Sequence, residues 1–394
     1  MSASTAPSAT TAHHPVAVIG GGLGGLALAR VLHVHGIDAA VFDLEADRSA
    51  RTQGGMLDLH QETGQAALRE AGLYEAFLAK ILPGGEAMRI LDKHGRVLRE
   101  EAGAAAAADG RPEIDRGDLR DLLLDSLPEG TVRWNSRAVS CRALGGGRHE
   151  VTLADGSAFT TDLLVGADGA WSRVRPLLSA AVPAYTGISF VEADLHDADA
   201  RHPEAAAVVG GGSLFALGDD RGFLAHRETD GSLHIYVALR ADESWLGTVD
   251  FSDAATDAAK AEVLARFDGW APALRNLVTE ADGPLVPRHV HALPIGHRWD
   301  RTPGVTLLGD AAHLMSPFAG EGANLALIDA ADLGRSLAEH PGDTEAALTA
   351  YERILFPRAE DTAGDSAEGL EILFNPQAPQ PLVDMFAGFA AARP

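Results

Sequence analysis

The sequence predicts an α/β fold with a parallel sheet, a separate antiparallel sheet and a C-terminal helical segment. Three observations predict it. Apolar strands that run into glycine-containing loops stand at 16–25, 163–169 and 305–310, as expected of buried parallel strands. Residues 180–283 instead form short strand-like runs joined by turns, which is typical of an antiparallel sheet. From 344 to 374 the spacing is mainly helical.

Composition and charge limit the function classes. The 394 residues, 46% hydrophobic and 22% charged, suit an ordinary soluble protein of two or three domains. A net charge of -24 disfavours nucleic acid and an anionic membrane as partners. Cys141 is the one cysteine in the sequence, so no intramolecular disulfide forms and a cytoplasmic setting is expected. Residues 1–14, rich in Ser, Thr and Ala, are expected to form a disordered tail and not a signal peptide.

The stretch from 16 to 43 combines a strand, a glycine turn, a helix and a second strand. In the spacing Gly20-x-Gly22-x-x-Gly25, the first glycine permits the turn, the second lets a pyrophosphate approach, and the third lets the helix pack closely. Asp43 ends the second strand, where a carboxylate binds both ribose hydroxyls of an adenosine and repels a 2'-phosphate. The stretch predicts FAD or NAD rather than NADP; the alternative is a close-packed turn that binds nothing.

Residues 44–180 carry a second candidate ligand loop among shorter elements. We expect helices at 62–71 and 116–127, a hairpin at 86–100, and an antiparallel insertion at 132–153. Asp118 is placed to cap the second helix, while Arg116 either reaches a phosphate or faces solvent. The buried strand at 163–165 runs into a second strand-to-helix loop, which carries Asp168-Gly169 at the strand end where ligands bind in such sheets.

In the antiparallel region, period-two alternation places polar and aromatic side chains together. Phe190, Glu192 and Asp194 share one face of their strand, and His234, Tyr236 and Arg240 share one face of theirs. Such a face suits a ligand floor, with an ordinary solvent-facing sheet surface as the alternative. His289 and His291 lack a nearby third ligand, so we predict no metal site.

A third ligand loop follows the strand at 305–308. Asp310 stands at the strand end, where its carboxylate either binds a ribityl or ribose hydroxyl or caps its own turn. A helix at 325–337 begins near Gly322 and aims its positive end beyond the loop. The C-terminal part is expected to be helical to Phe374, with a kink at Pro357 and a short apolar segment at 382–389.

Together the three loops resemble the fingerprints of single-component, class A FAD monooxygenases, the para-hydroxybenzoate hydroxylase class. Along nearly its whole length the chain looks most like the tetracycline-inactivating flavin monooxygenases of the TetX type. The runs that carry this resemblance are 54–60, 112–116 and 309–320.

The resemblance implies a division into domains. A Rossmann-type FAD-binding domain with a parallel sheet would comprise 15–80, 101–180 and 284–340. An antiparallel-sheet substrate domain would comprise 81–100 and 181–283, and the C-terminal segment 341–394 would supply a bridging helix.

The resemblance also assigns cofactor contacts. Asp43 would hold the adenosine ribose, and residues 320–324 would lie beside the isoalloxazine, where a helix N-terminus stabilises the charge of reduced flavin. Arg51 matches a position implicated in NADPH contact. No second GxGxxG exists, which suits a class in which NADPH visits without a domain of its own. The expected cofactor residues are Gly20, Gly22, Gly25, Asp43, Arg51, Asp58, Arg116, Asp168, Asp310, Gly320, Glu321, Gly322, Ala323 and Asn324.

Substrate contacts are expected on the antiparallel sheet and the third loop. The chain departs from tetracycline-degrading relatives, which carry glutamine in place of Glu192 and arginine in place of Ser213, so we expect the pocket to prefer a different charge. Leu44 replaces an arginine that relatives use against the adenine, a contact that Arg48 would have to supply. The expected substrate residues are Glu192, Ser213, His234, Pro317, Phe318 and Gly320.

The expected activity is that of an NADPH-dependent FAD monooxygenase on a polycyclic or aromatic enol or phenol, with a tetracycline-like compound among the candidates. By the resemblance, O2 adds to reduced flavin and a C4a-hydroperoxide passes a hydroxyl group to the substrate. No catalytic side chain is named, and a monomer is expected. The alternatives are an FAD-dependent reductase or dehydrogenase, and a flavoprotein that sequesters a ligand without turnover.

Overall fold

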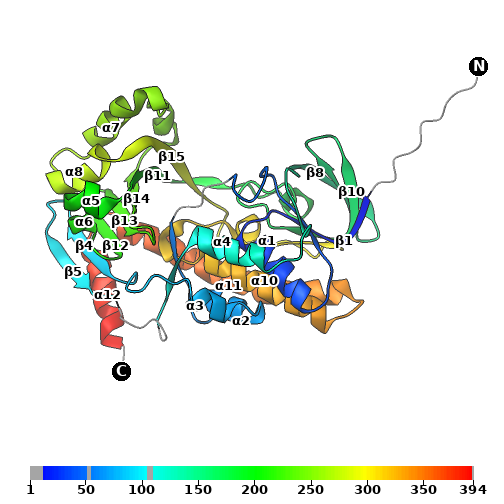
Figure 1. Cartoon of the computed structure of the whole chain (residues 1–394). Helices are drawn as coiled ribbons and strands as arrows, with labels where there is room; N and C mark the ends of the chain where they lie inside the picture. The colour runs from blue at the N-terminus through cyan, green and yellow to red at the C-terminus, as the bar shows by residue number, and fades with distance from the viewer. Residues whose placement is uncertain (1–11, 51–54, 104–109, 393–394) are drawn as a thin grey trace, which may run out of the picture.

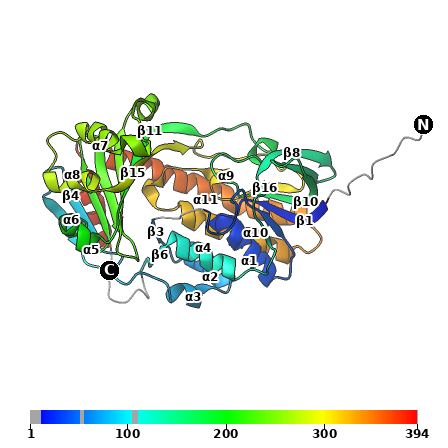
Figure 2. The ribbon, with the colours of Figure 1, turned by 45° about the horizontal axis from the view of Figure 1, so that its top comes forward.

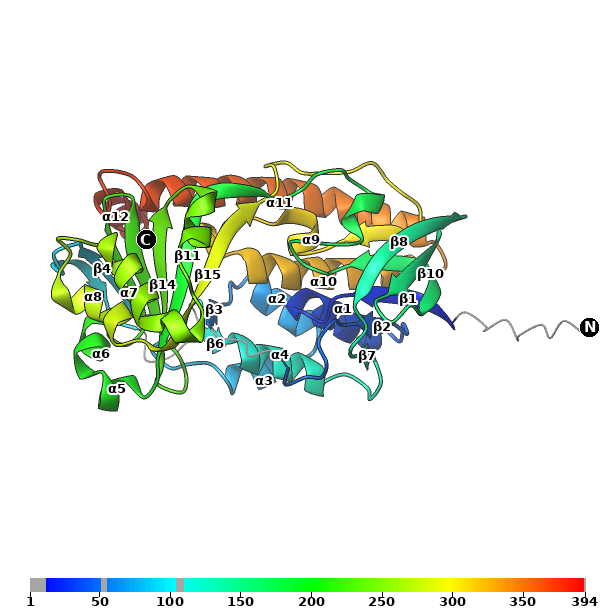
Figure 3. The ribbon, with the colours of Figure 1, turned by 90° about the horizontal axis from the view of Figure 1, so that it is seen from above.

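Two seven-stranded sheets lie at opposite ends of an elongated molecule. The computed structural model describes residues 12–50, 55–103 and 110–392. One sheet contains β1 (Ala12–Ile19) and β10 (Ala158–Gly166), and the other contains β11 (Ala184–Leu195) and β15 (Asp282–Ala292). Helix α11 (Thr344–Leu373) runs along the molecule from one sheet to the other (Figures 1 and 3).

The first sheet has the Rossmann-type parallel core that the sequence predicts. Its order is β7-β2-β1-β10-β9-β8, and β16 also pairs with β10. All pairs among β7, β2, β1, β10 and β16 are parallel, and the pairs β10–β9 and β9–β8 are antiparallel. The bounds of these further strands are β2 Ala40–Phe42, β7 Val132–Arg133, β8 Ala138–Gly145, β9 Arg148–Leu153 and β16 Val305–Leu307.

Helices cover the parallel core in layers. Helix α10 (Gly322–Glu339) lies between α1 (Leu23–Val34) and α11 (Figure 2). Helices α1 and α10 approach closely at Gly334 of α10, where a side-chain carbon would meet Val31 of α1. The remaining elements of this half are α2 Gly64–Glu70, α3 Tyr74–Leu78, α4 Arg116–Asp125, α9 Asp310–His313, the pair β3 Met56–Asp58 and β6 Glu113–Asp115, and the 3-10 turns η1 Arg175–Leu177 and η4 Pro317–Ala319.

The second sheet confirms the predicted antiparallel region. Its order is β15-β11-β14-β13-β12-β4-β5, and every pair is antiparallel except β12–β4. The expected hairpin at 86–100 is the β4–β5 pair at one edge. The bounds are β4 Met88–Asp92, β5 Val97–Glu101, β12 Ser213–Gly218, β13 Arg221–Arg227 and β14 Leu233–Arg240.

The two faces of the second sheet have different cores. Four helices pack on the outer face, where Phe223, Phe267 and Trp270 form an aromatic cluster. The inner face packs Phe190 and Ile90 against the end of α11 and against α12 (Gln380–Ala392). The outer elements are α5 Ala198–Arg201, α6 Pro203–Val209, α7 Thr256–Ala265, α8 Pro272–Thr279, η2 Glu243–Thr248 and η3 Asp253–Ala255 (Figure 3).

Helix α11 is the bridging helix that the resemblance implies. Its 30 residues span roughly 45 Å at 1.5 Å per residue. Near its start, the Tyr351 hydroxyl donates to Leu307 O on the parallel sheet at 2.9 Å. At its end, Leu370 and Leu373 lie in the inner core of the second sheet. Pro357 lies within the helix, which continues past it to Leu373.

Three local expectations were wrong. Strand β1 begins at Ala12, so residues 12–14, assigned to the tail, pair with 159–161; His14 packs edge-on against Phe42 and Phe159. The loop after β10 leads to the 3-10 turn η1 and not to an α-helix. The cap of α4 is Asp115, whose carboxylate accepts from Gly117 N, whereas Asp118 pairs with Lys80. The rest of the expected tail, 1–11, lies outside the described residues.

Two further findings concern metals and membranes. Among the described residues no group of three or more His, Cys, Asp or Glu side chains could hold a metal ion. Within the same part of the chain, no helix combines the length and apolar character that a membrane crossing requires.

Candidate functional site

The first glycine loop is tightly packed where the chain turns. It is open where a ligand would lie. A side-chain carbon on Gly20 would collide with Ala167 O, and one on Gly25 would collide with Gly20 O. A carbon on Gly22 would meet no heavy atom within 4 Å. No side chain caps α1, so the N–H groups of its first turn remain available. The turn therefore presents an anion-binding helix end to open space.

Asp43 shapes this turn as well as standing at the predicted ribose position. It is 7% exposed, and its Oδ2 accepts from Gly21 N at 2.6 Å while Oδ1 accepts from Glu45 N at 2.8 Å. Each carboxylate oxygen has a second lone pair. The carboxylate thus fixes the glycine turn and keeps acceptor capacity for a hydroxyl.

The second loop is tied to the other two. Asp168 accepts from the Ser172 hydroxyl at 2.5 Å and from Arg173 N at 2.6 Å, so its carboxylate organises its own loop. Arg175, 3% exposed, donates to Ala311 O on the third loop at 3.1 Å. Ala167 N donates to Ile19 O at the end of β1. The three loops therefore meet at the carboxyl edge of one parallel sheet.

Asp310 presents a carboxylate without a hydrogen-bond partner among the described residues. Asp310 is exposed, and no side chain caps α9, which begins at Asp310. Burial raises the pKa of Asp310, although the positive charges of His313, Arg116 and Arg175 oppose the rise. The Asp310 carboxylate is therefore accessible to a ligand. The structure thus lacks the turn cap that was the alternative reading of Asp310.

The start of α10 offers a second open helix end. Gly320 adopts φ +70°, no side chain caps the helix, and a carbon on Gly322 would meet nothing within 4 Å. Asn324 is fully buried, and its side chain accepts from His60 N at 2.9 Å and donates to Asp58 O at 2.9 Å. Its amide group is therefore used to hold the β3–α2 segment against α10.

His60 is a residue of this site that the sequence did not single out. It lies between two carboxylates, with Nε2 2.9 Å from Asp58 Oδ2 and Nδ1 2.6 Å from Glu321 Oε1. Burial lowers its pKa, but the hydrogen bonds and charges of Asp58 and Glu321 outweigh burial and raise the pKa to about 9. His60 is therefore an imidazolium at neutral pH, locked beside the α10 helix end.

The inner face of the second sheet carries paired charges. Arg288 forms an ion pair with Glu192, so the carboxylate expected to change the charge of the pocket is neutralised. His234 Nδ1 bonds Asp194 Oδ1 at 2.6 Å across β11 and β14. Ser213 lies on the same face, opposite His226 in the strand register. The negative charge that Glu192 was expected to bring to the pocket is therefore offset by Arg288, 96 residues further along the chain.

Phe318 joins the third FAD-type loop to this face. Its ring packs edge-on against Phe190 at 5.8 Å between centroids and against Phe374 at 5.1 Å. Gly369 on α11 permits the approach, because a side-chain carbon there would meet Phe318 O. The loop that carries Asp310 and α10 therefore ends on the aromatic part of the second sheet.

Comparison with known proteins identifies the family. A family model described as an FAD binding domain matches residues 13–365. Monooxygenase penA of Penicillium thymicola is 31% identical, over 89% of this chain and 93% of its own. Monooxygenase asqM of Emericella nidulans is 31% identical over 96% and 98%. Salicylate hydroxylase of Pseudomonas putida is 32% identical over 67% and 64%.

The chain belongs to the FAD-dependent monooxygenases.

Solved structures agree with this family at the level of fold. Klebsiella pneumoniae HpxO complexed with FAD and uric acid aligns with a TM-score of 0.78 at 22% identity, covering 96% of this chain and 93% of that one. Tetracycline destructase Tet(51) aligns with a TM-score of 0.71 at 19% identity, covering 96% and 95%. The resemblance to class A FAD monooxygenases is confirmed, and the likeness to TetX-type enzymes extends over the whole fold.

The residues of this FAD monooxygenase fit the cofactor. Two uncapped helix ends, at α1 and α10, face open space at Gly22 and Gly322 and suit anionic or electron-rich parts of FAD. The partnerless carboxylate of Asp310 suits a sugar or ribityl hydroxyl. The positive charge of Arg116 lowers the pKa of both Asp310 and Tyr236, so it acts on the FAD loops and on the second sheet.

Some expected contacts of this FAD monooxygenase remain predictions. Arg51 lies outside the described residues, so the NADPH contact is not described. Arg48 pairs with Asp121 at 2.8 Å and Asp125 at 2.9 Å, and the adenine contact left open by Leu44 remains a prediction. Leu44 itself is 62% exposed.

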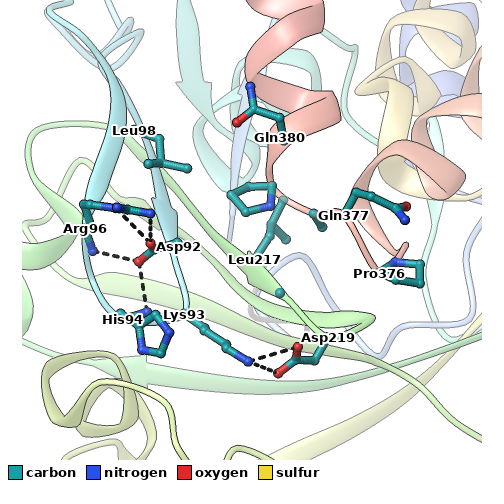
Figure 4. Close-up of a pocket in the computed structure, with 13 residues that line it drawn as sticks. Asp92, Lys93, His94, Arg96, Leu98, Leu217, Asp219, Pro376, Gln377 and Gln380 are labelled. Atoms are coloured by element: carbon teal, nitrogen blue, oxygen red, sulfur yellow. Dashed lines mark hydrogen bonds and ion pairs between the residues drawn. The ribbon is translucent and has the colours of Figure 1, made fainter.

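A separate pocket lies away from the FAD loops, between the β4–β5 turn, the β12–β13 turn and the loop before α12 (Figure 4). Its charged groups satisfy one another. Lys93 pairs with Asp219 at 2.8 Å, and Asp92 accepts from the backbone of His94 and from Arg96. No unpaired charge on this rim calls for a ligand.

Proposed function

We propose that this FAD monooxygenase hydroxylates a polycyclic or aromatic enol or phenol, with NADPH as the reductant and O2 as the oxygen source. The observation that carries the proposal is the contact between Phe318 and Phe190, since it joins the third FAD loop to a sheet face with aromatic and imidazole side chains. A relative that acts on an aromatic phenol, salicylate hydroxylase, supports the substrate class.

Bound FAD supplies the activation of O2 and the delivery of a hydroxyl group. The protein supplies binding and shielding. Phe190, Phe318 and Phe374 form an apolar shell at the meeting of the loop, the sheet and α11. Excluding water there protects a reactive oxygen species from loss before transfer.

The sheet face orients the substrate. Asp194 favours the protonated form of His234: burial lowers the pKa of His234, but the hydrogen bond and charge of Asp194 raise the pKa above its ordinary value. The imidazolium donates its remaining N–H to a substrate oxygen. Burial raises the pKa of Tyr236 to about 12, so its hydroxyl stays protonated beside His234.

A tetracycline-like compound belongs among the candidate substrates. The fold of Tet(51) supports its inclusion, and the ion pair of Glu192 with Arg288 removes the unpaired negative charge that would repel an enolate. Ser213 is smaller than the arginine of relatives and leaves room for a different substituent.

The test uses protein saturated with FAD and follows NADPH and NADH oxidation with salicylate, urate, tetracycline and 1-naphthol in turn. Stimulated NADPH oxidation, with a product heavier by one oxygen that carries label from isotopic O2, supports the proposal. Oxidation with an unlabelled product indicates a reductase or dehydrogenase. Binding of these compounds without any NADPH oxidation indicates a sequestering flavoprotein. Either of the last two results overturns the proposal.

A further inference from the structure

One row of side chains crosses four strands of the inner face. In the strand register Ser213 on β12 is opposite His226 on β13, His226 is opposite His234 on β14, and His234 is opposite Asp194 on β11. Directly opposite residues of antiparallel strands point to the same face of a sheet. The row therefore places two imidazoles side by side on the face toward the FAD loops, with ring centroids 6.2 Å apart and planes inclined by 15°.

The two imidazoles of the row differ in their partners. His234 Nδ1 lies 2.6 Å from Asp194 Oδ1, and in the protonated form that Asp194 favours, Nε2–H remains as a second donor. His226 makes no hydrogen bond to any described residue, yet part of its surface is accessible. Burial and the charge of His234 lower the pKa of His226 to about 4, against the opposing charge of Asp58. His226 is thus neutral and offers an unused acceptor nitrogen.

The charged groups around the pair are themselves paired. Asp194 balances His234, and Arg288 balances Glu192. Glu228, at the end of β13, accepts from Gly55 N at 2.6 Å and from the Ser232 hydroxyl at 3.1 Å. A ligand at the row therefore meets one donor and one acceptor rather than an excess of charge.

Tyr236 fixes the spacing of the pair. Its ring contacts His234 at 4.6 Å and His226 at 5.7 Å between centroids, edge-on in both cases. Aromatic contacts of this kind restrict how the imidazole rings turn. The donor and the acceptor are therefore held in a defined arrangement before any ligand binds.

We propose that His226 and His234 form an acceptor–donor pair that selects substrates with a hydroxyl group beside a carbonyl on an aromatic or enol framework. The substrate hydroxyl donates to a ring nitrogen of His226, and the carbonyl oxygen accepts from Nε2–H of His234. No covalent bond changes in this binding step. The inference deepens the proposed function and rests on it for the identity of the site.

The hydroxyl half of the pair is tested with two probes, 2-hydroxyacetophenone and its methyl ether 2-methoxyacetophenone. Their dissociation constants are measured from the change in flavin absorbance of FAD-loaded wild type, His226→Phe and His226→Gln. Phenylalanine keeps a ring without an acceptor, whereas glutamine restores an acceptor. FAD content and circular dichroism check that each variant is folded.

We expect His226→Phe to weaken binding of the hydroxy probe about tenfold, the equivalent of one hydrogen bond. His226→Gln should recover most of that lost affinity. The methyl ether should bind all three proteins alike, because it has no proton to donate. Equal weakening of both probes, no weakening of either, or failure of the hydroxy probe to bind wild type overturns the inference.

The outcome is separable from that of the proposed function. If labelled oxygen enters no product while the probe series behaves as expected, the recognition pair stands and the hydroxylation proposal fails. If hydroxylation occurs but the two probes respond alike to His226→Phe, the pair fails and the hydroxylation proposal stands.

Discussion

At the scale of single residues, the aspartates of the FAD loops have distinct tasks. Asp43 and Asp168 accept hydrogen bonds that stabilise the loops, whereas the Asp310 carboxylate makes no hydrogen bond to any described residue. A group with no structural bonds and a burial cost is retained at the expense of stability, which is common at functional sites.

Exchange of these aspartates for asparagine should separate binding from folding. We expect Asp310→Asn to leave the stability of the FAD-free protein unchanged, since Asp310 is exposed and its side chain makes no protein hydrogen bond that the change would remove. FAD affinity should fall at least tenfold. In contrast, Asp168→Asn should destabilise the FAD-free protein by about 1–2 kcal/mol, because it removes a charged acceptor. Denaturant melts and FAD titrations measure both effects; an Asp310→Asn protein that binds FAD normally would contradict the assignment.

His60 should make stability depend on alkaline pH. Its pKa rises from 6.5 in the unfolded chain to about 9 in the folded protein. The folded state therefore binds the extra proton, and the stabilisation is complete below pH 6.5 and is lost as pH rises through 9. The total is at most about 3 kcal/mol. His60→Gln should flatten unfolding free energy over this range, while His35→Gln, at an exposed pair with Glu70, should not.

Sequence reasoning found residues whose signal is local and missed those whose partners are distant. Gly20, Gly22 and Gly25 follow from spacing because turn, helix and ligand are built by consecutive residues. His60 could not be recognised, since Glu321 lies 261 residues further along the chain. The ion pair of Glu192 and Arg288 was missed for the same reason, and with it the true charge of the sheet face.

At the scale of elements, a buried ionic network fastens the third FAD loop to two helices. Asp329 on α10 is fully buried and accepts from Gly309 N at 3.0 Å and from His313 at 2.6 Å. Arg358 on α11 donates to Asp329 at 3.0 Å and to Asp332 at 2.8 Å. One network of hydrogen bonds and ion pairs therefore links the loop, α10 and α11.

Removal of the Arg358 side chain should destabilise the folded protein. Arg358→Met removes the cationic partner of Asp329 Oδ1 and one of the two arginines that pair with Asp332, which keeps Arg335, and we expect the unfolding free energy to drop by about 3 kcal/mol. Arg353→Met on the same helix is the control, because Arg353 is exposed and has no ion pair among the described residues. Urea unfolding of both variants measures the difference. A loss below about 1 kcal/mol for Arg358→Met would show that the network does not hold the elements together.

Element type was predictable where periodicity is strong. The buried strands, the hairpin and the long C-terminal helix were expected from side-chain spacing. The loop after β10 was not, because Asp168 binds Ser172 and Arg173 N and so directs the chain into a 3-10 turn. The start of β1 was also misplaced, since His13 and His14 are polar residues held in the strand by pairing with 160–161.

At the scale of the whole molecule, the proposed function depends on contacts between the two halves that carry the sheets. Phe318 touches the second sheet, Arg116 acts on groups of both halves, and α11 reaches from Leu307 to the inner core. The sequence indicated both sheets, but not that β4 would join β12 in parallel at the far edge. Long-range pairing of this kind leaves no local pattern.

The FAD affinity of the Gly22→Ala variant tests most directly whether the cofactor binds at the first glycine turn. An added methyl group would meet no protein atom within 4 Å, and the backbone at φ -76° accepts alanine, so the FAD-free variant should melt as wild type does. The control Gly364→Ala on α11 also meets nothing within 4 Å and should bind FAD normally. If the pyrophosphate lies against this turn, Gly22→Ala alone should lose FAD affinity at least tenfold. Unchanged FAD affinity in a folded Gly22→Ala protein would contradict the placement of the cofactor.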